Sequence, residues 1–417
     1  MKNKIKKNIL IMIPTLGRGG AERQVSVLTK NIRGDYEIDI LVKNLDSGIK
    51  YEYFGNIMNI NHKAGSNFLL KVFKYIKNLY FVFNIRNMKK YFKVISFMEE
   101  MNTLNVLTNL RSQNSILCIR SYPSKNIRGN SLSKVLYKLM MKVFYNSSDL
   151  IIAQTESMKS DLINRFKIKE KKIRVIPNLF ELSSIVNASN EQKISNQFVQ
   201  SLKKFTILSN LGQLIQLKGQ SHLIRILEKI KKNYRNVKLF IIGSGDMEFD
   251  LINLSNRLGL KVFIEHKDLL SDSYDVYFWK DTDNPFRLLK ISDIYIHAAY
   301  YEGFPNVIIE AMACSLPIIS SDCLSGPREI LAPYSKRPEN QTRAEYHEFG
   351  LLLPSFKAEN ENNKFDNYEL EKIWAEAIVK FIKNKQNIIN YAQKSLARCE
   401  DFSSTEIIKK WEKLITE

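Results

Sequence analysis

The stretch that most constrains the fold is residues 291–331, ISDIYIHAAYYEGFPNVIIEAMACSLPIISSDCLSGPREIL. The pattern predicts a buried strand over 291–299, a sharp turn, and a helix from about Asn306 to Cys314. Glu302 and Glu310 would then lie on opposite sides of one strand-to-helix turn. Because the first N–H groups of a helix are unpaired and carry a partial positive charge, such a turn can hold phosphates. The two carboxylates could accept hydrogen bonds from hydroxyl groups beside them.

Taken alone, the two glutamates are more simply interpreted as a loop charge and a solvated helix position. Their surroundings favour a ligand site. Residues 302–310, EGFPNVIIE, resemble the signature of two glutamates separated by seven residues in retaining glycosyltransferases of family 4. Residues 313–331 resemble the next strand and helix of that family's nucleotide-binding domain. The resemblance implies the GT-B fold, an α/β architecture in which two Rossmann-like doubly wound domains face a central cleft.

The length of 417 residues suits two domains rather than one core. We expect an acceptor-binding domain over 1–185, a nucleotide-sugar-binding domain over 186–395, and a C-terminal helix over 396–417. By resemblance, that helix packs back on the first domain. The Ser-, Asn- and Gln-rich residues 181–203 are predicted to be a linker.

No apolar run approaches the ~20 residues of a membrane span, and the short run 9–13 favours a first strand over a signal peptide. The four cysteines and five histidines show no metal-ligand spacing. We therefore expect a reduced, cytoplasmic chain. The resemblance to GT-B enzymes implies that it needs neither a metal nor a cofactor.

Positive charge is concentrated in the first half. Residues 1–180 contain 32 Lys and Arg against 12 Asp and Glu, whereas residues 181–417 contain 31 of each kind. This asymmetry indicates an anionic partner, and both nucleic acid and anionic lipid qualify.

Two apolar segments within this half are threaded with cations. The segment 68–92 and its border carry Lys71, Lys74, Lys77, Arg86, Lys89, Lys90 and Lys93. The segment 136–144, LYKLMMKVF, has a similar character. Each is either an ordinary helix with a basic face in water or a segment suited to lipid headgroups. Together they favour an anionic membrane surface as the partner of residues 1–180, with the enzyme peripheral on the inner face of the cell membrane.

Two loops of the first half bear further resemblance to the family. Gly19 and Gly20 open a G-G-A-E-R loop like the one that faces the donor phosphates in family 4, and the third glycine of the dinucleotide fingerprint is absent. Where relatives carry a Glu-His or Glu-Arg pair, this chain has Ile119 and Arg120. The catalytic base is thus unassigned, and the permanently cationic Arg120 is expected to contact a phosphate or the leaving group.

The second half keeps most of the family's donor motifs. Lys218 is retained, but Gln213 stands where relatives have an arginine, and a lost cation weakens a diphosphate site. Arg328 or a cation of the first domain is expected to compensate. The GSGD turn containing Gly245 resembles the family's G-x-G turn, and residues 268–283 form a longer segment than relatives have.

The resemblance implies transfer of a hexose or N-acetylhexosamine, with retention, from a nucleoside-diphosphate sugar to a glycan. A UDP-sugar is the favoured donor, and a polyprenyl-diphosphate or surface-polysaccharide glycan is the favoured acceptor. Glu302 would bind the sugar hydroxyls and Glu310 the ribose, while Lys218 and Arg120 would complete the catalytic set. The donor would also contact Gly19, Gly20, Gln213, Gly245, Gly303, Phe304, Pro305, Asn306 and Val307.

Three alternatives remain open from the sequence. A GT-B-fold epimerase would use the nucleotide sugar without an acceptor. A basic nucleic-acid-binding protein would explain the charge, although no recognised nucleic-acid module is present and nucleic acid is not expected as a partner. An inactive scaffold would account for Gln213 and the altered 119–123 stretch.

Overall fold

The computed structural model describes residues 6–60, 68–109, 114–126, 131–191, 193–280, 284–357 and 364–417. The chain forms two compact units: unit 1 comprises Met1–Phe180 and Phe402–Glu417, and unit 2 comprises Glu181–Asp401. The domain boundaries predicted at residues 185 and 395 lie a few residues from the two places where the chain passes from one unit to the other.

Unit 1 is built on a seven-stranded parallel sheet in the order β3-β2-β1-β4-β5-β6-β7. The strands are β1 Lys7–Ile13, β2 Tyr36–Val42, β3 Asn56–Asn59, β4 Lys93–Phe97, β5 Ser115–Cys118, β6 Leu150–Ala153 and β7 Ile173–Val175. Most are short apolar runs, as expected of strands whose two faces are both covered by helices.

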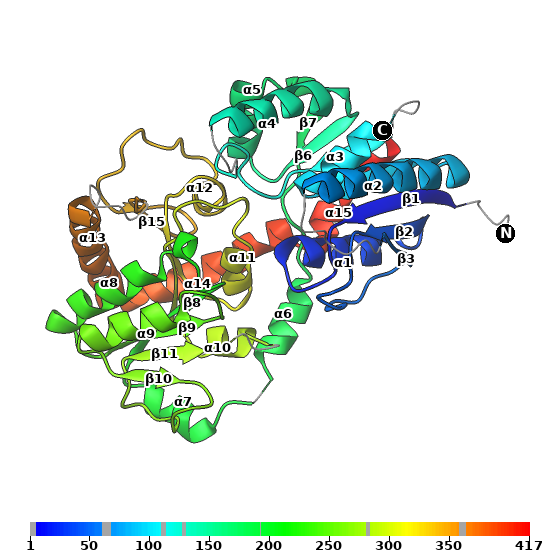
Figure 1. Cartoon of the computed structure of the whole chain (residues 1–417). Helices are drawn as coiled ribbons and strands as arrows, with labels where there is room; N and C mark the ends of the chain where they lie inside the picture. Colours follow the sequence, from blue (N-terminus) through cyan, green and yellow to red (C-terminus); the bar gives the residue numbers. More distant parts are fainter. Residues whose placement is uncertain are drawn as a thin grey trace. The chain divides into compact units, whose positions relative to one another are not determined.

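The helices of unit 1 divide between the two faces of this sheet (Figure 1). They are α1 Gly20–Ile32, α2 Phe68–Lys89, α3 Glu99–Leu107, α4 Ser131–Phe144, α5 Glu156–Phe166 and α15 Ser404–Thr416. The chain steps outward from β1 to β3 and then crosses back to β4, so right-handed connections place α1 on one face and α2 to α5 on the other. The C-terminal α15 packs against α1, with Ile407, Trp411 and Ile415 buried in the same core.

Unit 2 contains an eight-stranded sheet in the order β10-β11-β9-β8-β12-β13-β15-β14, parallel except for the β14–β15 pair. Its strands are β8 Thr206–Leu211, β9 Val237–Ile242, β10 Val262–Ile264, β11 Val276–Trp279, β12 Ile294–His297, β13 Ile318–Ser321, β14 Glu345–Tyr346 and β15 Leu351–Leu353. The strand β11 lies inside the segment 268–283. The strand pairs with both β9 and β10, and all four of its side chains are buried.

The helices of unit 2 are α6 Leu182–Ser189, α7 Asn196–Leu202, α8 Gln220–Asn233, α9 Glu248–Arg257, α10 Phe286–Lys290, α11 Asn306–Ala313, α12 Pro327–Leu331, α13 Lys364–Lys383 and α14 Lys385–Cys399. The prediction of a linker over residues 181–203 is wrong, since these residues form α6 and α7 (Figure 1). Apolar side chains at helical spacing are the physical reason. Leu182 and Ile185 of α6 are buried, and α6 packs on α10 and α11; Phe198 and Leu202 of α7 are buried as well.

Candidate functional site

The candidate site lies at the carboxyl ends of the strands of unit 2, where the strand order reverses. The chain leaves β8 toward β9 on one side and later returns to β12 on the other side of β8. Ligands of open α/β sheets bind at such a switch point, because the loops after the two strands diverge there. Lys218 follows β8, and Glu302 follows β12. Topology alone therefore brings these two predicted site residues to the same place.

The backbone of the loop after β8 packs closely against the backbone of the loop after β12. Gly219 has a φ of +69°, and a β-carbon there would collide with the carbonyl oxygen of Ala298. The Tyr300 N–H donates to the Leu217 carbonyl oxygen at 3.0 Å. Only glycine combines this left-handed conformation with so close a contact at no steric cost. Lys218, between Leu217 and Gly219, is thereby held beside the loop that carries Glu302.

One carboxylate oxygen of Glu302 receives two donors. Its Oε1 accepts from Lys218 Nζ at 2.6 Å and lies 3.0 Å from His297 Nε2. The side chain is buried, at 9% exposure. Burial alone would raise the pKa of Glu302, but Lys218 and His297 outweigh it and lower that pKa to about 2. Glu302 is therefore ionised at neutral pH, where it accepts hydrogen bonds and cannot act as a proton donor.

The second oxygen of this carboxylate, Oε2, makes no hydrogen bond to the part of the chain that the structure describes. It is the atom through which Glu302 can accept from a ligand hydroxyl.

Sequence reasoning missed His297, which ends β12. Its Nε2 faces Glu302, while its Nδ1 lies 3.3 Å from Ser320 Oγ on the neighbouring β13. The side chain is only 2% exposed. The available signal was a single histidine inside the apolar run IYIHAA, at the carboxyl end of a predicted strand.

The turn before α11 is tied to the following loop. Glu302 N–H donates to Leu324 O at 2.6 Å, and Ser325 Oγ donates to Gly303 O at 2.8 Å. Gly326, with a φ of +97°, leaves no room for a β-carbon beside the Pro305 ring. The helix N-terminus at residues 305–307 is thus held rigidly by the loop between β13 and α12.

Within this turn, Phe304 and Pro305 are buried, whereas Gly303, Asn306 and Val307 are partly exposed. The exposed members are those whose backbone a ligand can reach. Glu310, one turn into α11, is 7% exposed, so it is not the solvated helix position of the simpler interpretation.

The remaining predicted donor residues differ in their surroundings. Gln213 and Gly245 follow β8 and β9 and are both exposed. The suggestion that Arg328 replaces the missing arginine at 213 is wrong, because Arg328 is fully engaged elsewhere. Its guanidinium holds Asp322 at 2.8–3.1 Å and Glu345 at 2.9 Å, which makes it a structural cation of the β13–β15 region.

A buried polar triad supports the loop from behind. Glu371 of α13 lies 2.9 Å from His222 Nδ1, and His222 Nε2 lies 3.1 Å from the Tyr300 hydroxyl. Lys229 Nζ donates to the other oxygen of Glu371 at 3.0 Å, so that carboxylate is charge-paired. In the tautomer whose Nδ1–H donates to the carboxylate, Nε2 is the ring atom that can accept the Tyr300 O–H. Tyr300 is two residues before Glu302, so the triad anchors the loop that carries it.

In unit 1, Arg120 lies just past β5 among polar groups. Its Nη1 donates to Asn178 Oδ1 at 2.6 Å, and its guanidinium lies 4.6 Å from the ring centre of Phe97. Burial lowers the pKa of Arg120. Its Nε is buried without a hydrogen-bond partner among the described residues. This orphaned donor marks Arg120 as a cation with bonding capacity left for an anionic group.

Gly19 and Gly20 lie at the start of α1 in unit 1. Gly19 is the N-cap residue, and Glu22 in the first turn accepts from Thr15 Oγ1 at 2.7 Å. The glycines therefore open a helix N-terminus, but a buried carboxylate already stands there.

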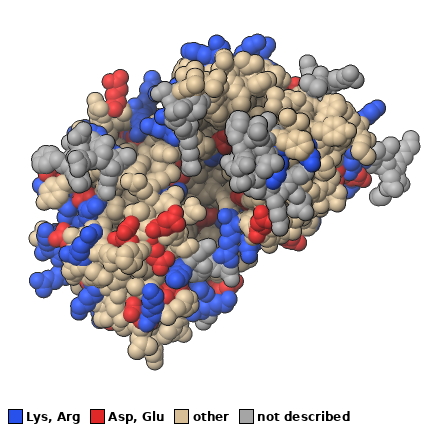
Figure 2. Space-filling model, in the orientation of Figure 1, with Lys and Arg blue, Asp and Glu red and all other residues tan. Residues whose placement is uncertain are grey.

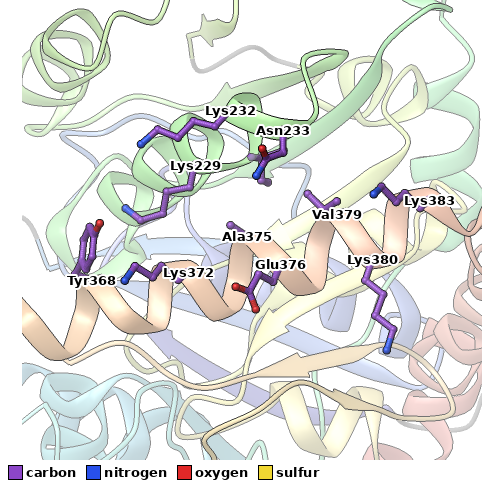
Figure 3. Close-up of a pocket in the computed structure, with 11 residues that line it drawn as sticks. Lys229, Lys232, Asn233, Tyr368, Lys372, Ala375, Glu376, Val379, Lys380 and Lys383 are labelled. Atoms are coloured by element: carbon purple, nitrogen blue, oxygen red, sulfur yellow. The ribbon is translucent and has the colours of Figure 1, made fainter.

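A separate cavity of about 580 Å³ lies between α8 and α13 of unit 2 (Figure 3). Lys229, Lys372 and Tyr368 gather at one end of it. Both lysines pair with glutamates of α13, at 3.0 Å and 2.8 Å. The lining residues of α8 come from its C-terminal half, and crossover helices run antiparallel to the strands, so this cavity is at the amino ends of the strands. It is not the site of Glu302.

No group of three or more His, Cys, Asp or Glu among the described residues is placed to hold a metal ion.

Sequence comparisons identify the family of the chain. Two family descriptions match the chain: Glycosyltransferase Family 4 over residues 18–184, and Glycosyl transferases group 1 over residues 191–340. An uncharacterized glycosyltransferase of Methanocaldococcus jannaschii is 31% identical over 370 residues, covering 86% of this chain and 87% of that protein.

A second relative is 26% identical over 85% of this chain and 87% of its own length. It is the Campylobacter jejuni N-acetylgalactosamine-N,N'-diacetylbacillosaminyl-diphospho-undecaprenol 4-alpha-N-acetylgalactosaminyltransferase.

Among solved structures, HepE of Anabaena, in complex with UDP and glucose, matches with a TM-score of 0.70 at 15% identity, over 98% of this chain and 99% of that one. The likeness shows the fold of two Rossmann-like units. Together with the family matches and the switch-point geometry, it leads to one conclusion: the chain belongs to the GT-B glycosyltransferases of family 4.

Proposed function

We propose that this glycosyltransferase moves a hexose or N-acetylhexosamine from a UDP-sugar to a lipid-linked or surface-polysaccharide glycan, with retention at the anomeric carbon. The observation that carries the proposal is the Glu302 carboxylate, held at the switch point by Lys218 and His297 with one oxygen open. A nucleotide-sugar donor needs such a fixed acceptor for its hydroxyls beside donors for its diphosphate.

The residues of unit 2 are assigned as follows. The open Oε2 of Glu302 accepts from the sugar hydroxyls, and Glu310 accepts from the ribose diol. Lys218 and the N–H groups of residues 305–307 stabilise the charge that develops on the leaving diphosphate. Because Glu302 keeps its charge at neutral pH, its role is binding and orientation rather than proton transfer.

The names of two relatives support the choice of acceptor, and one solved structure supports the choice of donor. The C. jejuni relative is named for a diphospho-undecaprenol acceptor, and a 28% identical Staphylococcus aureus relative for capsular polysaccharide biosynthesis. The Anabaena structure holds UDP and glucose. We extend these substrate classes to this chain, with the acceptor glycan presented at the cytoplasmic face of a membrane. The excess positive charge of residues 1–180 suits such a surface.

The proposal is tested by measuring free nucleoside diphosphate released from UDP-, GDP- and ADP-sugars, with and without lipid-linked glycans. We expect release from one donor that rises when the glycan is added. Glu302→Gln should abolish it, whereas Glu345→Gln should not. Glu345 is a matched control, since it too is paired with a cation, Arg328, and a histidine, His347, but lies away from the switch point.

Turnover that needs no acceptor would favour an epimerase. A folded protein that turns over no donor would contradict the proposal.

A further inference from the structure

The helix α4 of unit 1 presents an apolar stripe to solvent. Five of its side chains are between 55% and 67% exposed: Leu132, Val135, Leu136, Leu139 and Val143. At 3.6 residues per turn these positions fall on one strip about 100° wide. A soluble helix normally turns such a stripe inward. Here Met141 is buried against the protein instead, with Tyr137, Met140 and Phe144 partly buried.

Three lysines form a row along one flank of this stripe. Lys134, Lys138 and Lys142 follow one another at intervals of four residues, and all are exposed. None of the three makes an ion pair within the described parts of the chain. Their charges are therefore available to an external anion. Figure 2 shows Lys and Arg side chains along the upper edge of unit 1, over α4 and α5.

The neighbouring helix α2 adds a smaller apolar patch on the same face of the sheet. Phe73, Ile76 and Tyr80 are 56%, 56% and 68% exposed. The helix α3 lies between α2 and α4 and contacts both. Its residues 101–106 are all buried, so it forms the support under the two exposed helices.

Part of the positive charge counted on α2 in the sequence is not available. Arg86 is 8% exposed, and its guanidinium donates to Asn105 at 2.8 Å and to Asn114 Oδ1 at 2.7 Å. Lys89 pairs with Asp39 at 2.8 Å, and Lys93 is buried in β4. Arg86, Lys89 and Lys93 are therefore not available to a membrane surface. The row of three exposed lysines and the larger exposed apolar stripe are both on α4.

We infer that α4, extended by the patch on α2, is the surface by which the enzyme docks on an anionic lipid bilayer. This inference rests on the proposed function, since it names the surface that brings a lipid-linked acceptor within reach. No helix in the described ranges could cross a membrane. The stripe would enter the headgroup region while the lysine row lies along the anionic phosphates, the arrangement that interfacial amphipathic helices adopt.

The test is co-sedimentation of the full chain with vesicles of phosphatidylglycerol and phosphatidylethanolamine, compared with phosphatidylcholine alone. Wild type should bind the anionic vesicles and lose affinity as salt is raised. Leu136→Gln with Leu139→Gln should lower the partition coefficient by about tenfold or more. Ile389→Gln with Leu396→Gln is the matched control, since these residues of α14 are 53% and 43% exposed but belong to unit 2.

A second pair of variants separates a specific surface from net charge. Replacing Lys134, Lys138 and Lys142 by Gln should weaken binding roughly 100-fold at low salt. The same change at the exposed Lys409, Lys410 and Lys413 removes three lysines from α15, whose apolar face is buried, and should have a small effect. Equal losses in the two triple variants would overturn the docking surface.

Two other outcomes would also overturn the inference. One is the absence of vesicle binding by wild type. The other is a dimer in sedimentation velocity that the α4 variants dissociate, which would make a second copy of the chain the occupant of the stripe. Donor turnover is measured in parallel. Turnover without vesicle binding refutes the surface alone, and vesicle binding without turnover refutes the proposed function alone.

Discussion

Replacing Glu302 by glutamine should destabilise unit 2 at neutral pH, and this loss should shrink in acid. The substitution keeps the shape of the side chain but removes the charge that Lys218 and His297 hold. Because the Glu302 pKa is lowered in the folded state, the carboxylate stabilises the fold above its ordinary pKa of 4.5. That stability is lost as the pH falls through 4.5 toward 2.

The magnitude follows from the size of the shift. A pKa lowered from 4.5 to about 2 corresponds to about 3 kcal/mol of folding free energy at pH 7. Since Glu302 is nearly buried, solvent screens little of this. By pH 3.5 roughly 1 kcal/mol of it should be gone. The free energy of unfolding of wild type should thus exceed that of Glu302→Gln by about 3 kcal/mol at pH 7 and by about 2 kcal/mol at pH 3.5.

The assay is urea unfolding followed by tryptophan fluorescence in a Trp411→Phe background. Trp411 is in unit 1, while Trp279 and Trp374 are in unit 2, so the signal then reports unit 2 alone. Lys218→Met closes a double-mutant cycle, because it removes the other half of the ion pair. A stability difference that is the same at both pH values, or a coupling energy near zero, would refute the electrostatic reasoning.

Substitutions at three other residues probe the assigned roles. Glu310→Gln should raise the KM for the donor by tenfold or more, as steady-state kinetics would show; an unchanged KM would remove Glu310 from the donor site. Arg120→Gln should lower kcat at least tenfold and Arg120→Lys nearly as much, because a lysine lacks the planar fork; full rescue by lysine would reduce the role to simple charge. Tyr300→Phe removes the hydroxyl that lies 3.1 Å from His222 Nε2; it should cost about 1–2 kcal/mol of unit 2 stability and raise the KM for the donor, and wild-type kinetics would show that the triad does not position the Glu302 loop.

Much of the fold could be predicted because its signals are local. Apolar runs mark the strands, and the sharp turn at 300–305 marks the start of α11. The strand β11 was harder to predict, since its four apolar and aromatic residues 276–279 stand among charged and polar neighbours that are typical of a loop. The helices α6 and α7 were hidden for a similar reason: their few apolar residues are diluted by Ser, Asn and Gln.

The site could be predicted only in part, because its chemistry depends on tertiary contacts. The resemblance to family 4 indicated Glu302 and Lys218, but not that they share an ion pair or that His297 also contacts Glu302. The regular spacing of cations in α2 did not reveal that Arg86 faces a polar pocket. Only packing shows which side of a helix is buried, and so the sequence could not distinguish α2 from α4 as the exposed basic surface.

The most direct test of the account is a crystal structure of the enzyme with the nucleoside diphosphate that the donor panel selects. The account predicts the diphosphate within hydrogen-bond distance of Lys218 Nζ and the N–H groups of residues 305–307, with the ribose hydroxyls on Glu310. A diphosphate bound elsewhere, for example among the lysines between α8 and α13, would contradict it.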